Sequence, residues 1–483
     1  MYKNFEEFNL NKDILKALYN LKYKNPTKVQ SEVIPNFLKN KDVIVKSKTG
    51  SGKTASFAIP ICQSVDINNN SVHGLIIVPT RELALQVKEE ISSIGRLKKI
   101  RCSAIFGKQL MKDQINELKQ RVHIVVATPG RIIDHISRGT INLDNIKYFV
   151  IDEADKMLNK GFIDDMETII RKLPNSCVKG LFSATIEDNL NKICKNYMNE
   201  PLYIEIENGS NIEKKQIVEK YTKVERENRY NRLKELIYSE CPDSLIVFAN
   251  TKQNVIDLYN KMKKDKFSVG QIHGDMSQDK RLFTIKDFKE GKFDILVSTD
   301  VASRGIHIDG ISLVINYEVP RDKENYVHRI GRTGRHNKFG KAITIVSDIE
   351  QKFLEEIELY TNNKLIEIDN INEEKINIGK IKLKQKNIRG TKKENKNNKI
   401  VDSEITKIYL NAGKKKKIRV VDIVGAFSNI DGINNEDIGV IEVQELCSYV
   451  DILNNKGSKL LRKYKEINIK KKLVKIKKDN KNI

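Results

Sequence analysis

The chain contains no tryptophan, and only 6 cysteines and 9 prolines occur in its 483 residues. The cysteines lie far apart and form no C-x-x-C pair, which argues against a zinc site or a disulfide framework. No apolar run approaches the roughly 20 residues of a membrane span, and the N-terminal segment lacks the basic-then-apolar order of a signal peptide. We therefore expect a soluble protein that stays in the cytoplasm, without contact to a membrane.

Basic charge is concentrated toward the end of the chain. Of the formal net charge of +23, residues 375–483 carry +16, which leaves +7 for the first 374. A basic tail on a nearly balanced body is typical of a polyanion-binding appendage, because contact with phosphates releases their counterions. The alternative is a general lysine bias of the composition, although the body of the chain does not share the excess.

Apolar runs of strand length alternate with helical patterns in two successive stretches. The runs are 42–47, 74–80, 123–129, 148–155 and 180–185, followed by 244–251, 268–275, 293–300, 313–320 and 342–348. This alternation predicts parallel sheets covered by helices on both faces. From residue 404 the order becomes β-α-β-β-α-β, which favours a small α+β domain. The predicted domains are 1–205, 216–365 and 404–483, with an extended basic linker at 366–403.

The segment SKTGSGKT at residues 47–54 follows an apolar strand and precedes a helical pattern. Such a placement is typical of a P-loop, in which backbone N–H groups hold phosphates, Lys53 neutralises their charge and the Thr54 hydroxyl holds Mg²⁺. The strict pattern has glycine where Ser47 stands. A tight glycine-rich turn without nucleotide is therefore the alternative for this motif alone.

The acidic segment DEAD, Asp152 to Asp155, follows another apolar strand. One carboxylate can anchor Mg²⁺ while its neighbour orients or deprotonates an attacking water. Alone, the tetrapeptide also suits a solvated helix start. Its place downstream of a P-loop favours a nucleotide hydrolase.

The segment YVHRIGRTGR, residues 326–335, puts three arginines and a histidine into ten residues. Arginines presented to a γ-phosphate stabilise transition-state charge, and an exposed basic loop is the alternative.

Ten motifs follow one another along the chain. They are PTKVQ (26–30), SKTGSGKT (47–54), PTRELA (79–84), TPGR (128–131), DEAD (152–155), SAT (183–185), VFANT (247–251), QDKR (278–281), STDVASRG (298–305) and HRIGRTGR (328–335). In order and spacing, the series resembles the DEAD-box RNA helicases over roughly residues 1–365. The last domain is similar to the ribosomal-RNA-binding domain of the DbpA type. The resemblance implies an α/β fold of two tandem RecA-like parallel-sheet domains, followed by a small α+β RRM-like domain.

The resemblance also implies an ATP site and the residues that form it. Gln30 and Thr27 would read the adenine, Tyr23 would stack on it and Phe5 would support that loop. The phosphates would be held by Ser47, Thr49, Gly50, Ser51, Gly52, Lys53 and Thr54. Asp152 would hold Mg²⁺ with Thr54, Glu153 would be the general base, Arg332 and Arg335 the arginine fingers, and Asp300 and Gly305 would join the site. Asp155, Ser183, Thr185 and His328 would couple hydrolysis to RNA binding.

RNA would lie across both helicase domains. The contacts implied are Pro79, Thr80, Arg81, Thr128, Gly130 and Arg131 on the first domain and Thr251, Gln278, Arg281 and Thr299 on the second. Contacts to phosphate and 2′-OH carry little base information, so the core should bind RNA without much sequence preference. Three positions depart from the family pattern: Lys22 and Lys108 replace glycines, and His307 replaces an aspartate expected at the ATP ribose.

In the last domain, Tyr409 and Tyr449 fall on the first and third predicted strands, where an RNA-binding sheet presents stacking aromatics. Ordinary strand residues are the alternative, and the basic stretches 414–419 and 470–478 offer a second surface. We expect a monomeric ATP-dependent RNA helicase that opens short duplexes locally and is targeted to 23S rRNA in large ribosomal subunit assembly. The alternative is a general RNA chaperone or mRNA-decay helicase with an unspecific basic tail. A non-catalytic RNA scaffold and a DNA helicase are the rivals from other classes.

Overall fold

The computed structural model describes residues 2–47, 50–158, 160–186, 188–206, 217–300, 310–334, 339–388 and 405–479. Of the predicted site residues, Thr49, Gly305 and Arg335 lie outside this range, as does His307. Within the described residues, no helix is long and apolar enough to cross a membrane.

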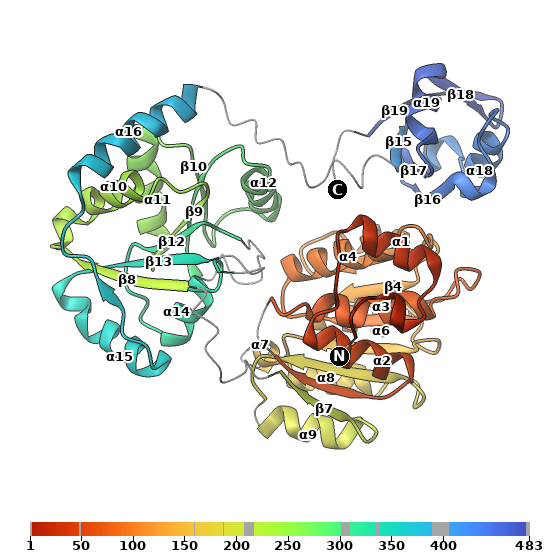
Figure 1. Cartoon of the computed structure of the whole chain (residues 1–483). Coiled ribbons are helices and arrows are strands. Elements are labelled where there is room, and N and C mark those ends of the chain that lie inside the picture. Colours follow the sequence, from red (N-terminus) through yellow and green to blue (C-terminus); the bar gives the residue numbers. More distant parts are fainter. Residues whose placement is uncertain are drawn as a thin grey trace. The chain divides into compact units, whose positions relative to one another are not determined.

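The first α/β domain, drawn in red to yellow in Figure 1, is built on a seven-stranded parallel sheet in the order β3-β4-β2-β5-β6-β1-β7. Its strands are β1 (Val43–Lys46), β2 (Gly74–Ile77), β3 (Cys102–Ile105), β4 (Ile124–Ala127), β5 (Tyr148–Asp152), β6 (Val178–Ser183) and β7 (Leu202–Glu205). Most of the strands from β1 to β6 are short runs rich in apolar residues, as expected for strands buried on both faces, whereas the edge strand β7 is largely exposed. The predicted parallel sheet is confirmed, and the prediction did not include β3 or β7.

Helices cover both faces of this sheet. One face packs against α1 (Lys12–Asn20), α2 (Lys28–Leu38), α3 (Lys53–Ser64) and α4 (Arg81–Gly95). The other packs against α6 (Pro129–Ser137), α7 (Ala154–Leu158), α8 (Ile163–Ile170) and α9 (Asp188–Tyr197), and α5 (Met111–Leu118) follows β3. Successive strand residues alternate between the two cores, because strand side chains have a period of two: Val43 and Val45 lie in the first core and Ile44 in the second.

The second α/β domain repeats this architecture with the strand order β10-β11-β9-β12-β13-β8-β14. The strands are β8 (Ile217–Lys223), β9 (Leu245–Phe248), β10 (Val269–Ile272), β11 (Ile295–Ser298), β12 (Leu313–Asn316), β13 (Gly340–Val346) and β14 (Ile366–Glu367). One face packs against α10 (Arg229–Glu240), α11 (Lys252–Lys264) and α16 (Glu373–Ile388), and the other against α12 (Gln278–Lys289), α14 (Lys323–Ile330) and α15 (Gln351–Thr361).

The prediction of an extended linker over 366–403 is wrong for residues 366–388. Residues 366–367 form β14, which pairs with β8, and α16 packs on α10. The Asn372 side chain accepts hydrogen bonds from the first turn of α16. Gly379 lets the two helices approach closely, because a Cβ there would lie 1.8 Å from the Tyr238 carbonyl oxygen. Residues 366–388 therefore extend the second α/β domain.

The C-terminal domain is a five-stranded antiparallel sheet in the order β16-β17-β15-β19-β18. Its elements are β15 (Thr406–Leu410), α18 (Val420–Ser428), β16 (Ile438–Val443), β17 (Ser448–Ile452), α19 (Lys456–Lys463), β18 (Glu466–Ile469) and β19 (Lys472–Lys478). The predicted order is confirmed up to α19. The last predicted strand is instead the hairpin β18–β19, because Lys470 and Lys471 form its turn with φ of 54° and 61°.

Candidate functional site

The P-loop lies between β1 and α3, at the carboxyl edge of the first sheet. Lys53 is buried, with 7% of its surface exposed, and its Nζ donates a hydrogen bond to the Ser47 carbonyl at 2.5 Å. The Ser47 backbone N–H in turn donates to the Ser183 carbonyl, which ties the loop to the end of β6. The Ser47 hydroxyl lies 2.7 Å from the Ser51 hydroxyl, so the first loop residue is held by backbone and hydroxyl contacts that a serine satisfies.

Gln30, one of the two residues predicted to read the adenine, contacts the P-loop directly. Thr27 and Gln30 form the capping box that starts α2, and the Gln30 side-chain Nε2 donates to the Gly52 carbonyl at 3.2 Å. Gly52 has φ +92°, and a Cβ on it would lie 2.6 Å from Gln30 Nε2. Glycine at this position therefore serves both the backbone conformation and the contact with Gln30.

Tyr23 is held by Glu90, a residue that lies outside the ten sequence motifs. The Tyr23 hydroxyl donates to Glu90 Oε1 on α4 at 3.1 Å, and the ring of Phe5 meets the Tyr23 ring edge-on at 6.0 Å. Burial raises the pKa of Glu90 to about 7, and the nearby Asp152 charge adds to that rise. The preceding residue, Lys22, has φ +63°, which explains why a glycine suits this position.

The acidic cluster lies at the end of β5, facing Lys53. Burial raises the pKa of Asp152 to about 6, while the Lys53 charge opposes that rise. The pKa of Lys53 is lowered by burial, and the charges of Asp152 and Glu153 oppose that decrease. Glu153 is 5% exposed, has φ +54° and accepts a hydrogen bond from Lys156 Nζ at 2.8 Å. This left-handed conformation at a carboxylate is typical of strain stored at a functional site.

Asp155 connects the acidic cluster to the end of β6. Its backbone N–H donates to Ser183 Oγ at 3.1 Å, and its Oδ2 accepts from the Ala184 N–H at 3.2 Å. Ser183 is fully buried, whereas Thr185 is exposed. Two of the predicted coupling residues are thereby in direct contact.

The predicted RNA residues of the first domain follow β2 and β4, whose carboxyl ends adjoin in the sheet. Thr80 caps α4 through its hydroxyl, and Thr128 and Pro129 begin α6. Burial, with the charge of Arg131 adding to it, lowers the pKa of Arg81. The open space around the Cβ position of Gly130 leaves the start of α6 accessible.

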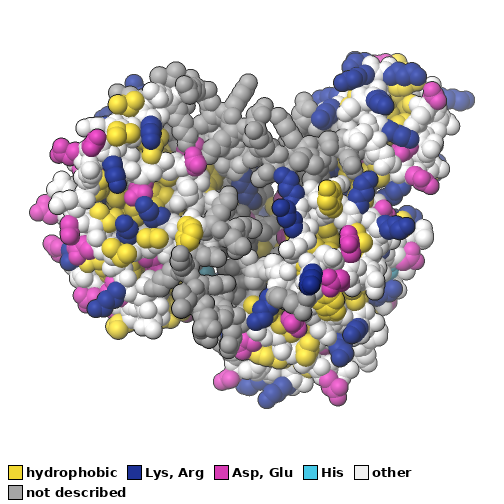
Figure 2. Space-filling model, viewed as in Figure 1, with side chains coloured by type: hydrophobic (Ala, Val, Ile, Leu, Met, Phe, Trp, Pro, Cys, Tyr) yellow, Lys and Arg dark blue, Asp and Glu magenta, His cyan; other side chains and the backbone are white. Residues whose placement is uncertain are grey.

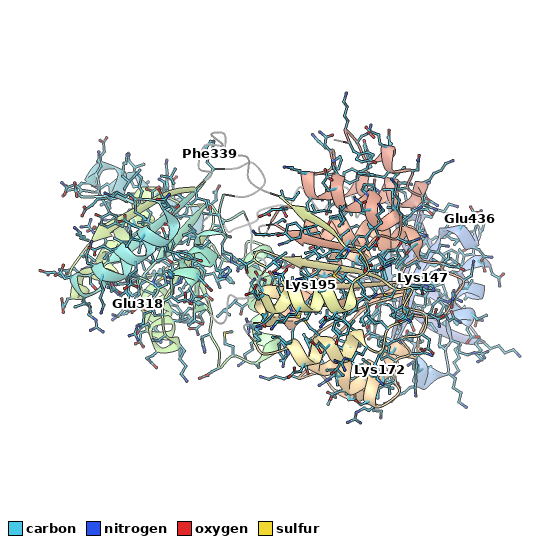
Figure 3. All side chains as sticks on the ribbon, turned by 90° about the horizontal axis from the view of Figure 1, so that it is seen from below. Lys147, Lys172, Lys195, Glu318, Phe339 and Glu436 are labelled. Carbon is cyan, nitrogen blue, oxygen red and sulfur yellow. The ribbon has the colours of Figure 1, made fainter. Side chains whose placement is uncertain are left out.

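The second domain gathers its site residues around Arg329, a buried side chain of α14 that is 1% exposed. Its guanidinium donates twice to the Asp300 carboxylate, and also to Asn250 Oδ1 at 2.8 Å and the Glu318 carbonyl at 2.9 Å. Figure 3 labels Glu318 in this domain. The Glu318 carboxylate accepts from the Asn250 N–H at 2.7 Å, which completes a buried network between the ends of β9, β11 and β12.

The remaining predicted residues of the second domain border this network. Thr251 caps α11 and follows Asn250, while Thr299 precedes Asp300 and is 7% exposed. His328 is exposed on α14, and Arg332 is 8% exposed, with its N–H bonded to the Arg329 carbonyl. Gln278 and Arg281 lie in the first turn of α12. Sequence reasoning assigned no role to Arg329, although it lies inside the motif HRIGRTGR (328–335). Only the packed structure shows which groups its side chain bonds to.

The C-terminal domain carries an aromatic pair and a basic patch. Tyr409 and Tyr449 are directly opposed on β15 and β17, with ring centroids 5.7 Å apart, as their predicted strands require. The basic patch consists of Lys414–Lys417, Arg419 and Lys470–Lys472. Its two segments are joined by hydrogen bonds from Lys472 Nζ to the Lys416 carbonyl at 3.0 Å and from Lys470 Nζ to the Lys417 carbonyl at 3.3 Å. Figure 2 shows Lys and Arg side chains over the visible face of this domain.

Comparisons with known proteins assign the three domains. Residues 27–193 match the DEAD/DEAH box helicase family, residues 228–337 the helicase conserved C-terminal domain, and residues 407–478 the DbpA RNA binding domain. The chain is 45% identical over 479 residues to the ATP-dependent RNA helicase DbpA of Bacillus subtilis, covering 99% of this chain and 100% of that protein. The chain belongs to the DbpA-type DEAD-box helicases.

Other relatives of this DbpA-type helicase share the core. The DEAD-box ATP-dependent RNA helicase CshA of Geobacillus kaustophilus is 43% identical over 361 residues, which cover 75% of this chain and 77% of that protein. The solved structure of S. cerevisiae Dbp5 bound to RNA and ADP BeF3 is 32% identical, with a TM-score of 0.69, and covers 79% of this chain and 99% of that chain. The DbpA-type helicase is therefore an RNA-stimulated ATPase that unwinds RNA, as predicted.

Proposed function

We propose that this DbpA-type helicase acts on 23S rRNA during assembly of the large ribosomal subunit, and that it works as a cytoplasmic monomer. The basic patch of the C-terminal domain carries this proposal, because it joins two sequence-distant lysine segments on one surface of a domain that matches the DbpA RNA binding domain. Tethering this domain to one RNA site raises the local concentration of neighbouring duplexes at the helicase core. The two helicase domains, which have no base preference of their own, would thereby act on the RNA duplexes next to the bound site.

The chemistry of the first domain fits a magnesium nucleotide. Thr54 and Asp152 offer hydroxyl and carboxylate oxygens, which are the ligands that Mg²⁺ prefers, and the buried Lys53 ammonium lies near the same carboxylates. When bound, Mg²⁺ neutralises charge on the β- and γ-phosphates. Gln30 and Thr27 then read the adenine, and Tyr23 stacks on it with Phe5 behind.

Glu153 is the general base of the proposed mechanism. Its carboxylate orients the attacking water and accepts a proton from it, and the Lys156 ammonium at 2.8 Å helps to fix the side chain. Arg332 and Arg335 stabilise the charge that develops on the transferred phosphoryl group. Asp300 and Gly305 complete the nucleotide site from the second domain.

Coupling to RNA passes through the contact of Asp155 with Ser183. Asp155 follows the general base by two residues and bonds to the residues that end β6. A change at the γ-phosphate therefore acts on Ser183 and Thr185, and His328 is the proposed coupling residue of the second domain. RNA backbone contacts come from Pro79, Thr80, Arg81, Thr128, Gly130 and Arg131, and from Thr251, Gln278, Arg281 and Thr299.

Steady-state ATPase of the full chain tests the target. The assay compares no RNA, a generic single strand and a 23S rRNA fragment that carries the peptidyl-transferase-region hairpin. We expect the 23S fragment to stimulate at a much lower concentration than the generic strand. The double variant Lys415→Gln, Lys471→Gln should remove that advantage while leaving stimulation by the generic strand intact.

The matched control is Lys459→Gln, Lys463→Gln, which removes the same charge from exposed positions of α19. If all RNAs stimulate alike, the tail is a general basic clamp and the protein is a general RNA chaperone or mRNA-decay helicase. The assay can also use a chain that lacks the C-terminal domain. Such a chain should end after α16 and not at the start of the predicted linker near Asp369, because the earlier end would remove a helix that packs on α10.

A further inference from the structure

A lysine occupies a strained backbone position in the loop between β3 and α5. Lys108 has φ +66°, in the left-handed region that favours glycine, and its side chain is exposed. Non-glycine residues persist in such conformations where the surrounding structure over-determines them, and these positions cluster at functional sites. The positive φ of Lys108 therefore makes its exposed side chain a candidate for a functional role.

The loop lies between the two arginines of the first domain's RNA surface. On one side of Lys108, a Cβ on Gly107 would lie 3.3 Å from Arg81 Nη2. On the other side, the Gln109 carbonyl accepts a hydrogen bond from Arg131 Nη1 at 3.1 Å. Lys108 is thus the middle residue of a segment that lies beside the Arg81 guanidinium and accepts a hydrogen bond from Arg131.

A buried polar network fixes this segment. Gln114 on α5 is 1% exposed, and its Nε2 donates to the Phe106 carbonyl at 2.8 Å and to Gln109 Oε1 at 2.9 Å. The Gln114 Oε1 accepts from Arg131 Nη1 at 3.0 Å and lies 3.1 Å from Nε2 of the fully buried His135. The backbone on both sides of Lys108 is therefore held, so the position of its Cα is determined by the fold.

We propose that Lys108 is a third cation of the RNA surface of the first helicase domain and that its ammonium pairs with an RNA phosphate beside Arg81 and Arg131. This inference rests on the proposed RNA contacts of those two arginines. A lysine contact to phosphate acts as a point charge and does not read bases. Lys108 therefore adds affinity for any single strand and makes that affinity more sensitive to salt.

Lys266 provides a control for the strain. It has φ +62°, is exposed, and follows the C-terminal end of α11, at the opposite end of that helix from Thr251. Replacing either lysine with glycine relieves the same kind of strain, since glycine adopts positive φ without steric cost. Only the change at Lys108 should alter the RNA concentration needed for ATPase stimulation.

The experiment uses the full chain with an oligouridylate strand and measures the RNA concentration at half-maximal ATPase stimulation over a series of salt concentrations. For Lys108→Gly we expect a higher unfolding temperature, about 3- to 10-fold more RNA at half-maximal stimulation, and a salt dependence reduced by about 0.7 in the log–log slope. Lys108→Asn, which tolerates positive φ, should show the RNA effect. Lys266→Gly should raise the unfolding temperature and leave the RNA response unchanged.

The variant Arg131→Gln distinguishes a wrong role for Lys108 from a wrong RNA surface. If Arg131→Gln weakens RNA stimulation while both Lys108 variants match the wild type, the role of Lys108 is refuted and the proposed RNA surface stands. If Arg131→Gln also leaves stimulation unchanged, the proposed surface itself is wrong. A loss at Lys266→Gly equal to that at Lys108→Gly would likewise overturn the proposal, because strain relief alone would then explain both.

Discussion

Arg329 donates two hydrogen bonds to the Asp300 carboxylate, from Nε and from Nη2, the latter at 2.6 Å. The same guanidinium bonds to Asn250, the residue before Thr251. Arg332 lies three residues after Arg329 in the sequence. The proposed RNA contacts Thr251 and Thr299 and the proposed finger Arg332 are therefore positioned by one buried side chain. Because the network has a single centre, a change at Arg329 should disturb RNA and ATP functions together.

Arg329→Lys tests this positioning role. Lysine keeps the charge but loses the planar fork, so the bidentate contact with Asp300 cannot form. With hydrogen bonds to charged groups worth about 1.5–3 kcal/mol each, we expect kcat of the RNA-stimulated ATPase to fall at least about tenfold. Arg329→Lys combined with Asp300→Asn should be no slower than the single variants. The positioning role of Arg329 would be contradicted if the losses of kcat in the two single variants added up in the double variant. It would also be contradicted if Arg329→Lys lowered the folded fraction while the folded protein kept its kcat.

Gly52→Ala separates backbone strain from contact with Gln30. At Gly52 an added Cβ meets Gln30 Nε2 at 2.6 Å and φ is +92°. At Gly139, where φ is +61°, no atom lies within 4 Å of the added Cβ. Both alanine variants should lose stability, by about 1–2 kcal/mol from the left-handed conformation. Only Gly52→Ala should raise KM for ATP, and equal KM values for the two variants would show that Gln30 does not depend on this contact.

Glu90→Gln gives a pH-dependent prediction. The pKa of Glu90 rises from its ordinary value of 4.5 to about 7 through burial, so between these values the folded protein binds a proton that the unfolded chain has released. This contribution to stability is present below pH 4.5 and is lost as the pH rises through about 7. The unfolding temperature of the wild type should therefore fall more between about pH 5 and about pH 8 than that of Glu90→Gln.

The variant Tyr23→Phe completes this test, because it removes only the hydroxyl that bonds to Glu90. If Glu90 positions the Tyr23 ring, Glu90→Gln and Tyr23→Phe should raise KM for ATP to a similar extent, without additivity in the double variant. Asp152, with a pKa raised by burial to about 6, titrates in the wild type and in both variants. Because its charge also raises the pKa of Glu90, the difference between wild type and Glu90→Gln reports Glu90 together with its interaction with Asp152. A parallel pH dependence of wild type and Glu90→Gln would show that Glu90 does not titrate in this range.

The aromatic pair of the C-terminal domain can be tested against the basic patch. Tyr409 has Lys477 Nζ 4.9 Å from its ring centroid, and Tyr449 has Lys407 Nζ at 5.3 Å, so each ring already lies beside a cation. If bases stack on these rings, Tyr409→Leu with Tyr449→Leu should weaken binding of the 23S fragment by about 1–3 kcal/mol per base. Unchanged binding in a folded variant would leave the patch as the recognition surface.

Part of the candidate site could be located from sequence because the residues predicted for it stand in local motifs. The P-loop, the acidic segment and the capping box of Thr27 with Gln30 each involve residues a few positions apart, and the structure brings Gln30 into contact with Gly52 of the P-loop. The two parallel sheets were also predictable, since their central strands are continuous apolar runs. The edge strands β3, β7 and β14 and the strand β8 beside β14 were not, because their sequences are partly polar and gain stability only from their neighbours.

The sequence by itself determined that this is an ATP-dependent RNA helicase with two α/β domains and a basic C-terminal domain. Only the tertiary structure decided that Arg329 bonds to Asp300, that Glu90 holds Tyr23, and that residues 373–388 form a helix on α10. It also decided that the basic residues around 416 and 470 share one patch. Each of these relations joins residues far apart in the chain, and such pairs form only when packing of the apolar cores brings their elements together.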